Sequence, residues 1–215
     1  MSIFSSLIRS WSSQISEADH LSTATEDRDD IQIQHLEGFS TGRRRAVCNR
    51  RVSKLAKLLA EALDQPPEWQ HQIREAAPLH DLGKLWVPDE ILEKPGPLTE
   101  EEYEEVKKHT LVGASLLSGG GSAPVQMAER IARSHHERWD GQGYPDGLTG
   151  KEIPLSARIV AVADAFDALT HDRPYRDALP VEKAFSIIDA QSGAQFAPQV
   201  SDAALRRRAE MTALV

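Results

Sequence analysis

Apolar residues recur at steps of three and four along most of the chain after residue 43, the spacing that places them on one face of an α-helix. The first such stripe contains Val52, Leu55, Leu58, Leu59 and Leu63. Residues 155–170 repeat the pattern with a strongly apolar composition. No segment alternates apolar and polar residues as a β-strand would, and no internal repeat is visible. The pattern predicts an all-α fold.

Local signals mark where these helices begin and end. Pro66-Pro67 opens a second helix that runs toward His80. Thr99 followed by Glu102 predicts a capping box at the start of a third helix, which we expect to carry His109 near its end. The other boundary signals are the break at Gly119-Gly120-Gly121, the helix starts at Pro124 and Pro180, of which the second opens the last helix, and the Gly- and Pro-rich loop at 141–154.

Residues 1–42 differ in composition from the rest of the chain. A short stretch with helical spacing precedes a polar, acidic segment at 12–34, which is typical of a linker. We therefore expect a short N-terminal helix and a polar, disordered linker over 1–42. One domain is expected at 43–200, followed by a C-terminal helical tail at 201–215.

Length and charge narrow the class of protein. The 215 residues suffice for one domain with a full core and an appendage. A total of 25 Lys and Arg against 33 Asp and Glu gives a formal net charge of −8. This balance disfavours binding to DNA or RNA, because such affinity comes largely from basic side chains on phosphates.

Cys48 is the single cysteine, which excludes an intrachain disulfide and suits a reducing compartment. No apolar run approaches the ~20 residues that span a bilayer. Residues 1–11 lack the early positive charge and long apolar core of a signal peptide. The sequence therefore predicts a cytoplasmic protein without a membrane span.

Histidine and aspartate residues supply the candidate chemistry. His80-Asp81 and His135-His136 are adjacent pairs, and His109 and Asp164 lie elsewhere along the chain. Neutral imidazole and carboxylate are ligands that suit Zn, Mn or Fe. Because neighbours on a helix point about 100° apart, each pair can serve two ions, or Asp81 can bridge them. Two close metals suit phosphodiester hydrolysis, since they bind phosphate oxygens and activate a water.

These residues belong to a longer ordered series of motifs. The series consists of His80-Asp81-Leu82-Gly83-Lys84, Pro88-Asp89-Glu90-Ile91-Leu92, Lys94-Pro95-Gly96, His109, His135-His136-Glu137-Arg138-Trp139-Asp140-Gly141-Gln142-Gly143-Tyr144-Pro145, Ile153-Pro154-Leu155-Ser156-Ala157-Arg158-Ile159, Ala163-Asp164-Ala165-Phe166-Asp167-Ala168-Leu169-Thr170 and Asp172-Arg173-Pro174-Tyr175-Arg176. On these residues the chain resembles the HD-GYP family, the phosphodiesterase branch of the all-α HD superfamily, over roughly residues 43–200. The resemblance implies an HD-superfamily helical bundle with HD-GYP C-terminal helices.

The resemblance also implies a role for each polar residue. It assigns as metal ligands His80, Asp81, His109, His135, His136 and Asp164. Lys84 would contact the scissile phosphate and act with Asp81 in catalysis. The implied nucleotide contacts are Asp167, Arg173 and Arg176, the last standing where the family often has Lys. Glu137 is either a solvated charge or a partner that fixes a histidine tautomer.

Members of this family typically hydrolyse cyclic di-GMP, and some act on cyclic GMP-AMP. We therefore expect a phosphodiesterase that opens cyclic di-GMP to pGpG, GMP or both, with two divalent ions of Fe, Mn or Zn, or three. The resemblance also implies that an exposed loop, Gly143-Tyr144-Pro145, contacts GGDEF-domain diguanylate cyclases. A homodimer is a further expectation.

The first helix departs from the family pattern. The family usually begins with Glu-Thr-Gly-x-His, whose Glu and His share a helix face and supply further metal ligands. Counting back from Val52, the His position holds Cys48 and the Glu position holds Arg44. Anchoring on Thr41-Gly42 instead places Ser40 and Arg44 there. Neither register restores the pair.

Three outcomes of this departure stay open. Cys48 as a thiolate ligates a softer metal such as Zn or Fe. Alternatively, a two-metal site survives on the remaining six ligands. In the third case catalysis fails, and the chain is a regulator that binds cyclic di-GMP or a protein partner. Cys48 equally suits a small apolar core position. A related HD phosphohydrolase acting on another nucleotide is a further functional alternative.

Overall fold

The computed structural model describes residues 43–172 and 177–215, with side chains from Arg50 onward. The predicted N-terminal segment at 1–42 and the predicted nucleotide contacts Arg173 and Arg176 lie outside the described residues. Across the described ranges the regular elements are α-helices and short 3₁₀ helices, and no strand forms. Two isolated β-bridges, Asp140 with Thr149 and Ser192 with Phe196, connect loop segments. The prediction of an all-α fold is confirmed.

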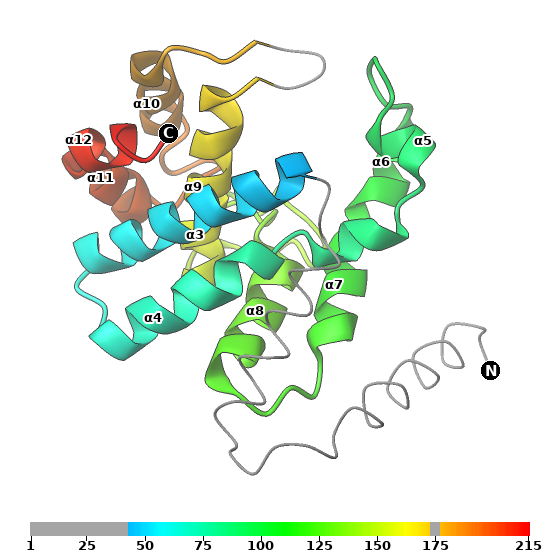
Figure 1. The fold of residues 1–215 in the computed structure, drawn as a ribbon, viewed down its shortest axis with the longest axis horizontal. Helices are drawn as coiled ribbons and strands as arrows, with labels where there is room; N and C mark the ends of the chain where they lie inside the picture. The colour runs from blue at the N-terminus through cyan, green and yellow to red at the C-terminus, as the bar shows by residue number, and fades with distance from the viewer. Residues whose placement is uncertain (1–42, 173–176) are drawn as a thin grey trace.

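Two long helices organise the domain. Helix α3 (Arg43–Ala62) crosses α9 (Leu155–Thr170), and both bounds of α9 are those that the sequence predicted. Helix α3 also packs on α4 (Pro67–Ala76), and α4 packs on α8 (Ala123–Ser134) (Figure 1). Helix α7 (His109–Leu117) lies against α8 on the far side of α4.

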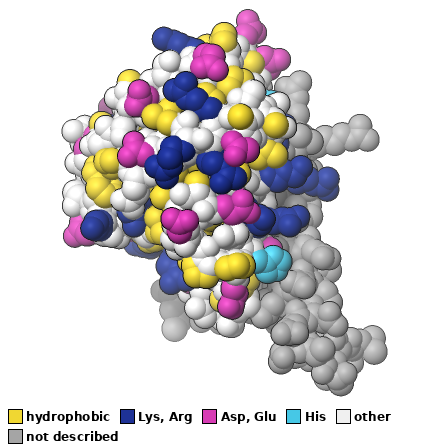
Figure 2. All heavy atoms as spheres, turned by 90° about the vertical axis from the view of Figure 1, so that its left-hand side faces the viewer, with side chains coloured by type: hydrophobic (Ala, Val, Ile, Leu, Met, Phe, Trp, Pro, Cys, Tyr) yellow, Lys and Arg dark blue, Asp and Glu magenta, His cyan; other side chains and the backbone are white. Residues whose placement is uncertain are grey.

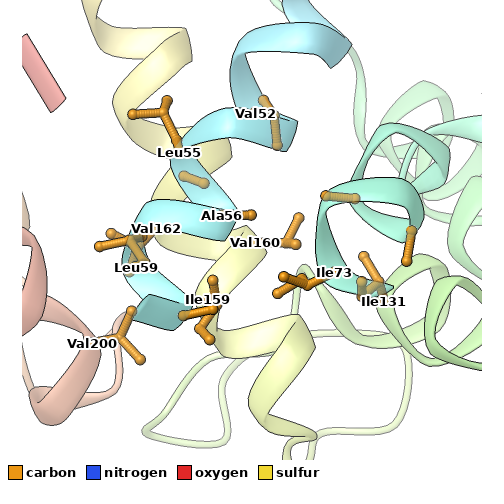
Figure 3. Close-up of a cluster of buried hydrophobic side chains, with 14 of the residues drawn as sticks. Val52, Leu55, Ala56, Leu59, Ile73, Ile131, Ile159, Val160, Val162 and Val200 are labelled. Atoms are coloured by element: carbon orange, nitrogen blue, oxygen red, sulfur yellow. The ribbon is translucent and has the colours of Figure 1, made fainter. Parts of the chain in front are cut away.

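The predicted stripe on α3 is the centre of the core. Val52, Leu55 and Leu59 are 0% exposed, and Leu58 and Leu63 pack at its edge. Their neighbours in Figure 3 come from α4, α8, α9 and α11 (Pro198–Arg206): Ile73, Ile131, Ile159, Val160, Val162 and Val200. Each fully buried aliphatic side chain contributes roughly 1.5–3 kcal/mol relative to exposure. This core holds the helices that carry the polar residues of the predicted site.

The region around His109 differs from the prediction. The capping box of Thr99 and Glu102 does begin a helix, α6 (Glu100–Lys107), but this helix ends before His109. His109 is instead the first residue of α7. The break arises because two side chains bond to carbonyls of the preceding turn. The His109 ring donates a hydrogen bond to the Val106 carbonyl (2.6 Å), and the Thr110 hydroxyl donates one to the Lys107 carbonyl (2.9 Å). Side chains that bond to backbone carbonyls compete with helix continuation.

Three helices form the C-terminal part of the chain. Helix α10 (Val181–Ala190) starts after Pro180 as expected, and α11 and α12 (Arg208–Thr212) follow it in the region where a helical tail was expected. Helix α11 runs through the expected boundary at residue 200, with Val200 and Ala203 buried on either side.

Figure 2 shows the face on the left of Figure 1, where basic and acidic side chains are interspersed. Within the described part of the chain, no helix has the length and apolar character that crossing a membrane requires.

Candidate metal centre

A tight contact between two segments begins the site. After α4 the chain forms two 3₁₀ helices, Ala77–Leu79 and Leu82–Trp86, with His80 and Asp81 between them. Gly83 then lies directly against α7. A Cβ atom at Gly83 would be 2.0 Å from the His109 carbonyl oxygen and 2.6 Å from the Gly113 nitrogen. Only glycine permits this approach, which sets Asp81 beside His109.

Four predicted ligands converge at this point. Asp81 Oδ1 lies 3.4 Å from His109 Nε2 and 3.8 Å from His135 Nε2. The two histidine Nε2 atoms are 3.5 Å apart. Together with His136, which follows His135 at the C-terminal end of α8, the ligand atoms of these residues all lie within 4.8 Å of one another. Such a group can surround one metal ion.

Of the other two predicted ligands, His80 faces the second oxygen of Asp81, and Asp164 lies against His80. His80 Nε2 is 3.5 Å from Asp81 Oδ2 and 3.7 Å from Asp164 Oδ1. Asp81 thus directs Oδ1 toward His109 and His135, and Oδ2 toward His80. A carboxylate with ligands on both sides is the arrangement that lets it bridge two ions. The structure therefore brings five predicted ligands around the Asp81 carboxylate, with Asp164 next to His80.

Backbone carbonyls orient three of the four histidines. Nδ1 of His80 bonds to the Ala77 carbonyl (2.8 Å), Nδ1 of His109 to that of Val106, and Nδ1 of His135 to that of Ile131 (3.0 Å). Because a carbonyl only accepts, each Nδ1 carries the proton. Each Nε2 then keeps its lone pair toward the centre, as a metal ligand requires. These carbonyl partners could not be predicted from the sequence.

The charge states also suit a cation. Burial lowers the pKa of His109 to about 4 and that of His136 well below its ordinary value, so both rings are neutral near pH 7. Burial would raise the pKa of Asp81, but the adjacent Lys84 ammonium holds it well below its usual range. Asp81 Oδ1 is buried and accepts no hydrogen bond. An ionised, unsatisfied oxygen facing neutral imidazoles fits a divalent metal.

Metal-free protein is expected to lose stability as the pH falls from 6.5 to about 4. In this window the unfolded chain protonates His109 and the folded chain does not, so folding becomes less favourable with falling pH. The protonation of His109 in the unfolded chain lowers the free energy of unfolding by roughly 2 kcal/mol near pH 5. Thermal melts of chelator-treated protein at about pH 7 and pH 5 measure it. A His109→Gln variant should lose less, and an equal loss would contradict the prediction.

Lys84 lies beside the centre, where its ammonium is 2.5 Å from Asp81 Oδ2. Asp167 is placed differently. Its carboxylate is 0% exposed and forms an ion pair with Arg51 of α3, while His171 lies 3.4 Å from the same carboxylate. The structure thus brings Lys84 to the ligands and buries Asp167 one turn of α9 beyond Asp164. Substrate contact by these residues stays a prediction.

The loop after the two histidines folds back onto them. A Cβ atom at Gly143 would lie 2.3 Å from the Arg138 nitrogen, so this position needs glycine. The Tyr144 ring then stacks on His136, with centroids 4.9 Å apart. Glu137 is only 4% exposed, and its carboxylate accepts the amide protons of Asp146 (2.7 Å) and Leu148 (3.1 Å). Glu137 therefore orders this loop, a role that neither sequence interpretation assigned to it.

The replaced positions of the family pattern, Arg44 and Cys48, both lie in the first turns of α3. Their side chains are outside the described part of the chain. Ligation by Cys48 therefore stays a prediction.

Comparison with known proteins agrees with this geometry. The chain belongs to the HD domain family, whose model matches residues 32–200, and within it to the HD-GYP group. It is 50% identical over 161 residues to "Cyclic di-GMP phosphodiesterase response regulator RpfG" of Xanthomonas campestris, covering 75% of this chain and 43% of the relative. A "Cyclic di-GMP phosphodiesterase" of Thermotoga maritima is 48% identical, covering 75% and 44%. The chain thus spans less than half the length of these relatives.

Solved structures share the fold. A cyclic GMP-AMP specific phosphodiesterase of V. cholerae, V-cGAP3, superposes with a TM-score of 0.61 at 17% identity, covering 83% of this chain and 48% of that one. Bd1817, an HDG"Y"P protein from Bdellovibrio bacteriovorus, gives 0.60 at 20% identity, covering 82% and 62%. At this identity the likeness concerns the helical architecture.

Proposed function

We propose that the chain is a metal-dependent phosphodiesterase that hydrolyses cyclic di-GMP to pGpG, GMP or both. The observation that carries the proposal is the two-sided environment of Asp81, with histidine Nε2 atoms facing each of its oxygens. The relatives named for cyclic di-GMP are 40–50% identical, and those named for 3'3'-cGAMP are 39–42% identical. The relatives above 42% identity are all named for cyclic di-GMP, which supports this substrate.

The ligand set suits two ions of Fe, Mn or Zn. Asp81, His109, His135 and His136 suit one of them, and His80 and Asp164 share Asp81 toward the other. Divalent ions at such a site polarise the phosphate and activate water for attack on phosphorus. A third ion would need ligands from α3, where Arg44 and Cys48 replace the usual Glu and His.

The protein's own groups prepare the reaction. The imidazoles of His80, His109 and His135 keep their Nε2 atoms in place through carbonyl hydrogen bonds, so little reorganisation is needed. The Lys84 ammonium, held by Asp81, is a point charge that can pair with a phosphate oxygen and with the charge developing on it during attack. Tyr144 covers one face of His136 and excludes water from that side of the centre.

One observation favours a second function. The replacement of both first-helix ligands would suit a catalytically impaired regulator that binds cyclic di-GMP at the same site. Contact of the Gly143-Tyr144-Pro145 loop with GGDEF-domain cyclases stays a prediction, as does a homodimer. Tyr144 stacks inward, and the exposed residues next to this loop are Gln142, Asp146 and Gly147.

Turnover separates the two functions. Protein purified anaerobically and supplied with Fe(II) or Mn(II) is expected to convert cyclic di-GMP to linear products that chromatography resolves. A Cys48→His variant should also be active, because the six described ligands do not depend on that position. Binding of cyclic di-GMP without turnover in the wild type would contradict the enzyme and support the regulator. Turnover gained only in Cys48→His would trace the defect to that ligand.

A further inference from the structure

Tyr103 on α6 is a large aromatic residue without a place in the proposed chemistry. It is 46% exposed, although it lies close to a buried polar centre. Helix α6 and the short α5 (Asp89–Leu92) project from the side of the domain in Figure 1. Tyr103 reaches from this projection to the loop that carries Tyr144, since their ring centroids are 6.3 Å apart. An exposed aromatic ring beside the metal centre is a candidate for contact with a bound ligand.

The two tyrosines and Lys107 form a defined corner. The rings are nearly perpendicular, at 81°, and Lys107 Nζ lies over both, 4.8 Å from the Tyr103 centroid and 5.5 Å from the Tyr144 centroid. Lys107 therefore occupies the inner angle between the rings. The opposite face of Tyr144 rests on His136. The exposed part of Tyr103 is then the face turned away from Lys107.

Ring contacts place this corner beside the metal centre. The Tyr103 ring contacts the Tyr144 ring, and the Tyr144 ring stacks on His136, a predicted metal ligand, with centroids 4.9 Å apart. One tyrosine ring therefore separates Tyr103 from the centre. A dinucleotide whose phosphate is bound at the centre has Tyr103 beside it.

We propose that Tyr103, braced by Lys107 and Tyr144, is the stacking platform for a purine base of the dinucleotide whose phosphate is bound at the metal centre. The proposal rests on the function proposed above. Every nucleobase has a π-face, and stacking on an aromatic side chain is a common way of binding single-stranded nucleotides. Lys107, which pairs with Glu104 (2.6 Å), supports the inner face of the Tyr103 ring and leaves the outer face to the base.

The alternative for an exposed aromatic residue is a protein interface. Leu85, Trp86 and Leu111 are also exposed, at 38%, 41% and 43%. They lack the cation and the ring contacts that join Tyr103 to the centre among the described residues. An exposed aromatic face that ring and cation contacts hold in place favours a flat aromatic ligand over an aliphatic surface.

Substrate comparison tests the platform. Wild type, Tyr103→Ala and Tyr103→Phe are assayed with Mn(II) on cyclic di-GMP and on methyl 4-nitrophenyl phosphate, a phosphodiester without a purine. Tyr103→Ala is expected to raise KM and Kd for cyclic di-GMP roughly tenfold, with kcat and the small substrate unchanged. Tyr103→Phe keeps the stacking face and should resemble the wild type. Leu111→Ala serves as the control for loss of exposed apolar surface.

The outcomes separate the two proposals. An unchanged KM and Kd in Tyr103→Ala, or equal losses on both substrates, would overturn the platform. A loss as large in Leu111→Ala would overturn it too, since it would point to a general surface effect. If the wild type binds cyclic di-GMP without hydrolysing it, the phosphodiesterase proposal fails. The Kd comparison between Tyr103→Ala and wild type then decides the platform by itself.

Discussion

An Asp81→Ala variant is expected to lose hydrolysis of cyclic di-GMP. The carboxylate faces His109 and His135 with one oxygen and His80 with the other, and it also holds Lys84. Replacement by Ala removes the bridge between both halves of the centre and frees the ammonium at once. Loss of a residue that merely supports a ligand typically costs about 10–100-fold in affinity or activity. Loss of the shared ligand should therefore exceed roughly 100-fold.

The measurement pairs turnover with metal content. Asp81→Ala is expected to bind substoichiometric metal after loading with Mn(II), while its thermal unfolding stays cooperative because the apolar core is untouched. Asp189→Ala, which removes an exposed carboxylate from α10, is the matched control and should behave as the wild type. Wild-type turnover in Asp81→Ala would show that the chemistry occurs elsewhere.

Gly83→Ala is the second variant with a large expected effect. The added Cβ would collide with backbone atoms of α7 rather than with a flexible side chain, at 2.0 Å from the His109 carbonyl oxygen. The 3₁₀ segment and α7 must then separate, and His109 moves away from Asp81. Overpacking of this kind typically costs about 1–3 kcal/mol. We expect a lower Tm, reduced metal content and turnover close to that of Asp81→Ala.

Glycine controls isolate the steric cause. At Gly96 and Gly121 an added Cβ would meet no atom within 4 Å, so Gly96→Ala and Gly121→Ala should keep the wild-type Tm and activity. If Gly83→Ala loaded metal normally and melted with the wild type, the close contact would not be what positions His109.

Helices and core were largely predictable from the sequence, because both follow from local rules. Proline at a first turn, a capping box and three- and four-residue apolar steps determined α4, α6, α8 and α9. The break before His109 was missed, because it depends on ring and hydroxyl contacts to carbonyls of the preceding turn. Such competition is invisible in the apolar pattern.

The candidate ligands were predicted from the resemblance to the family. The apolar periodicity alone could not predict that they lie close together in space. Asp81 and His135 are separated by several helices, so only the packing of α7 on α8 and on the 3₁₀ segment brings them together. Partners at long range were harder still. Arg51 of α3 pairs with the buried Asp167 of α9. No local signal connects a residue of α3 with one of α9.

The hydrogen bonds that tie three histidine rings to carbonyls of their own chain segments have a consequence for metal exchange. Each ring is anchored by the backbone that precedes it, so the apolar core fixes the ligands before an ion arrives. The free energy of metal binding is then not consumed in ordering the polypeptide, unlike in zinc fingers, which are unfolded without metal. Ions can therefore leave and be replaced while the helices persist. The supply of each metal ion and its affinity for imidazole and carboxylate then decide which metal occupies the centre.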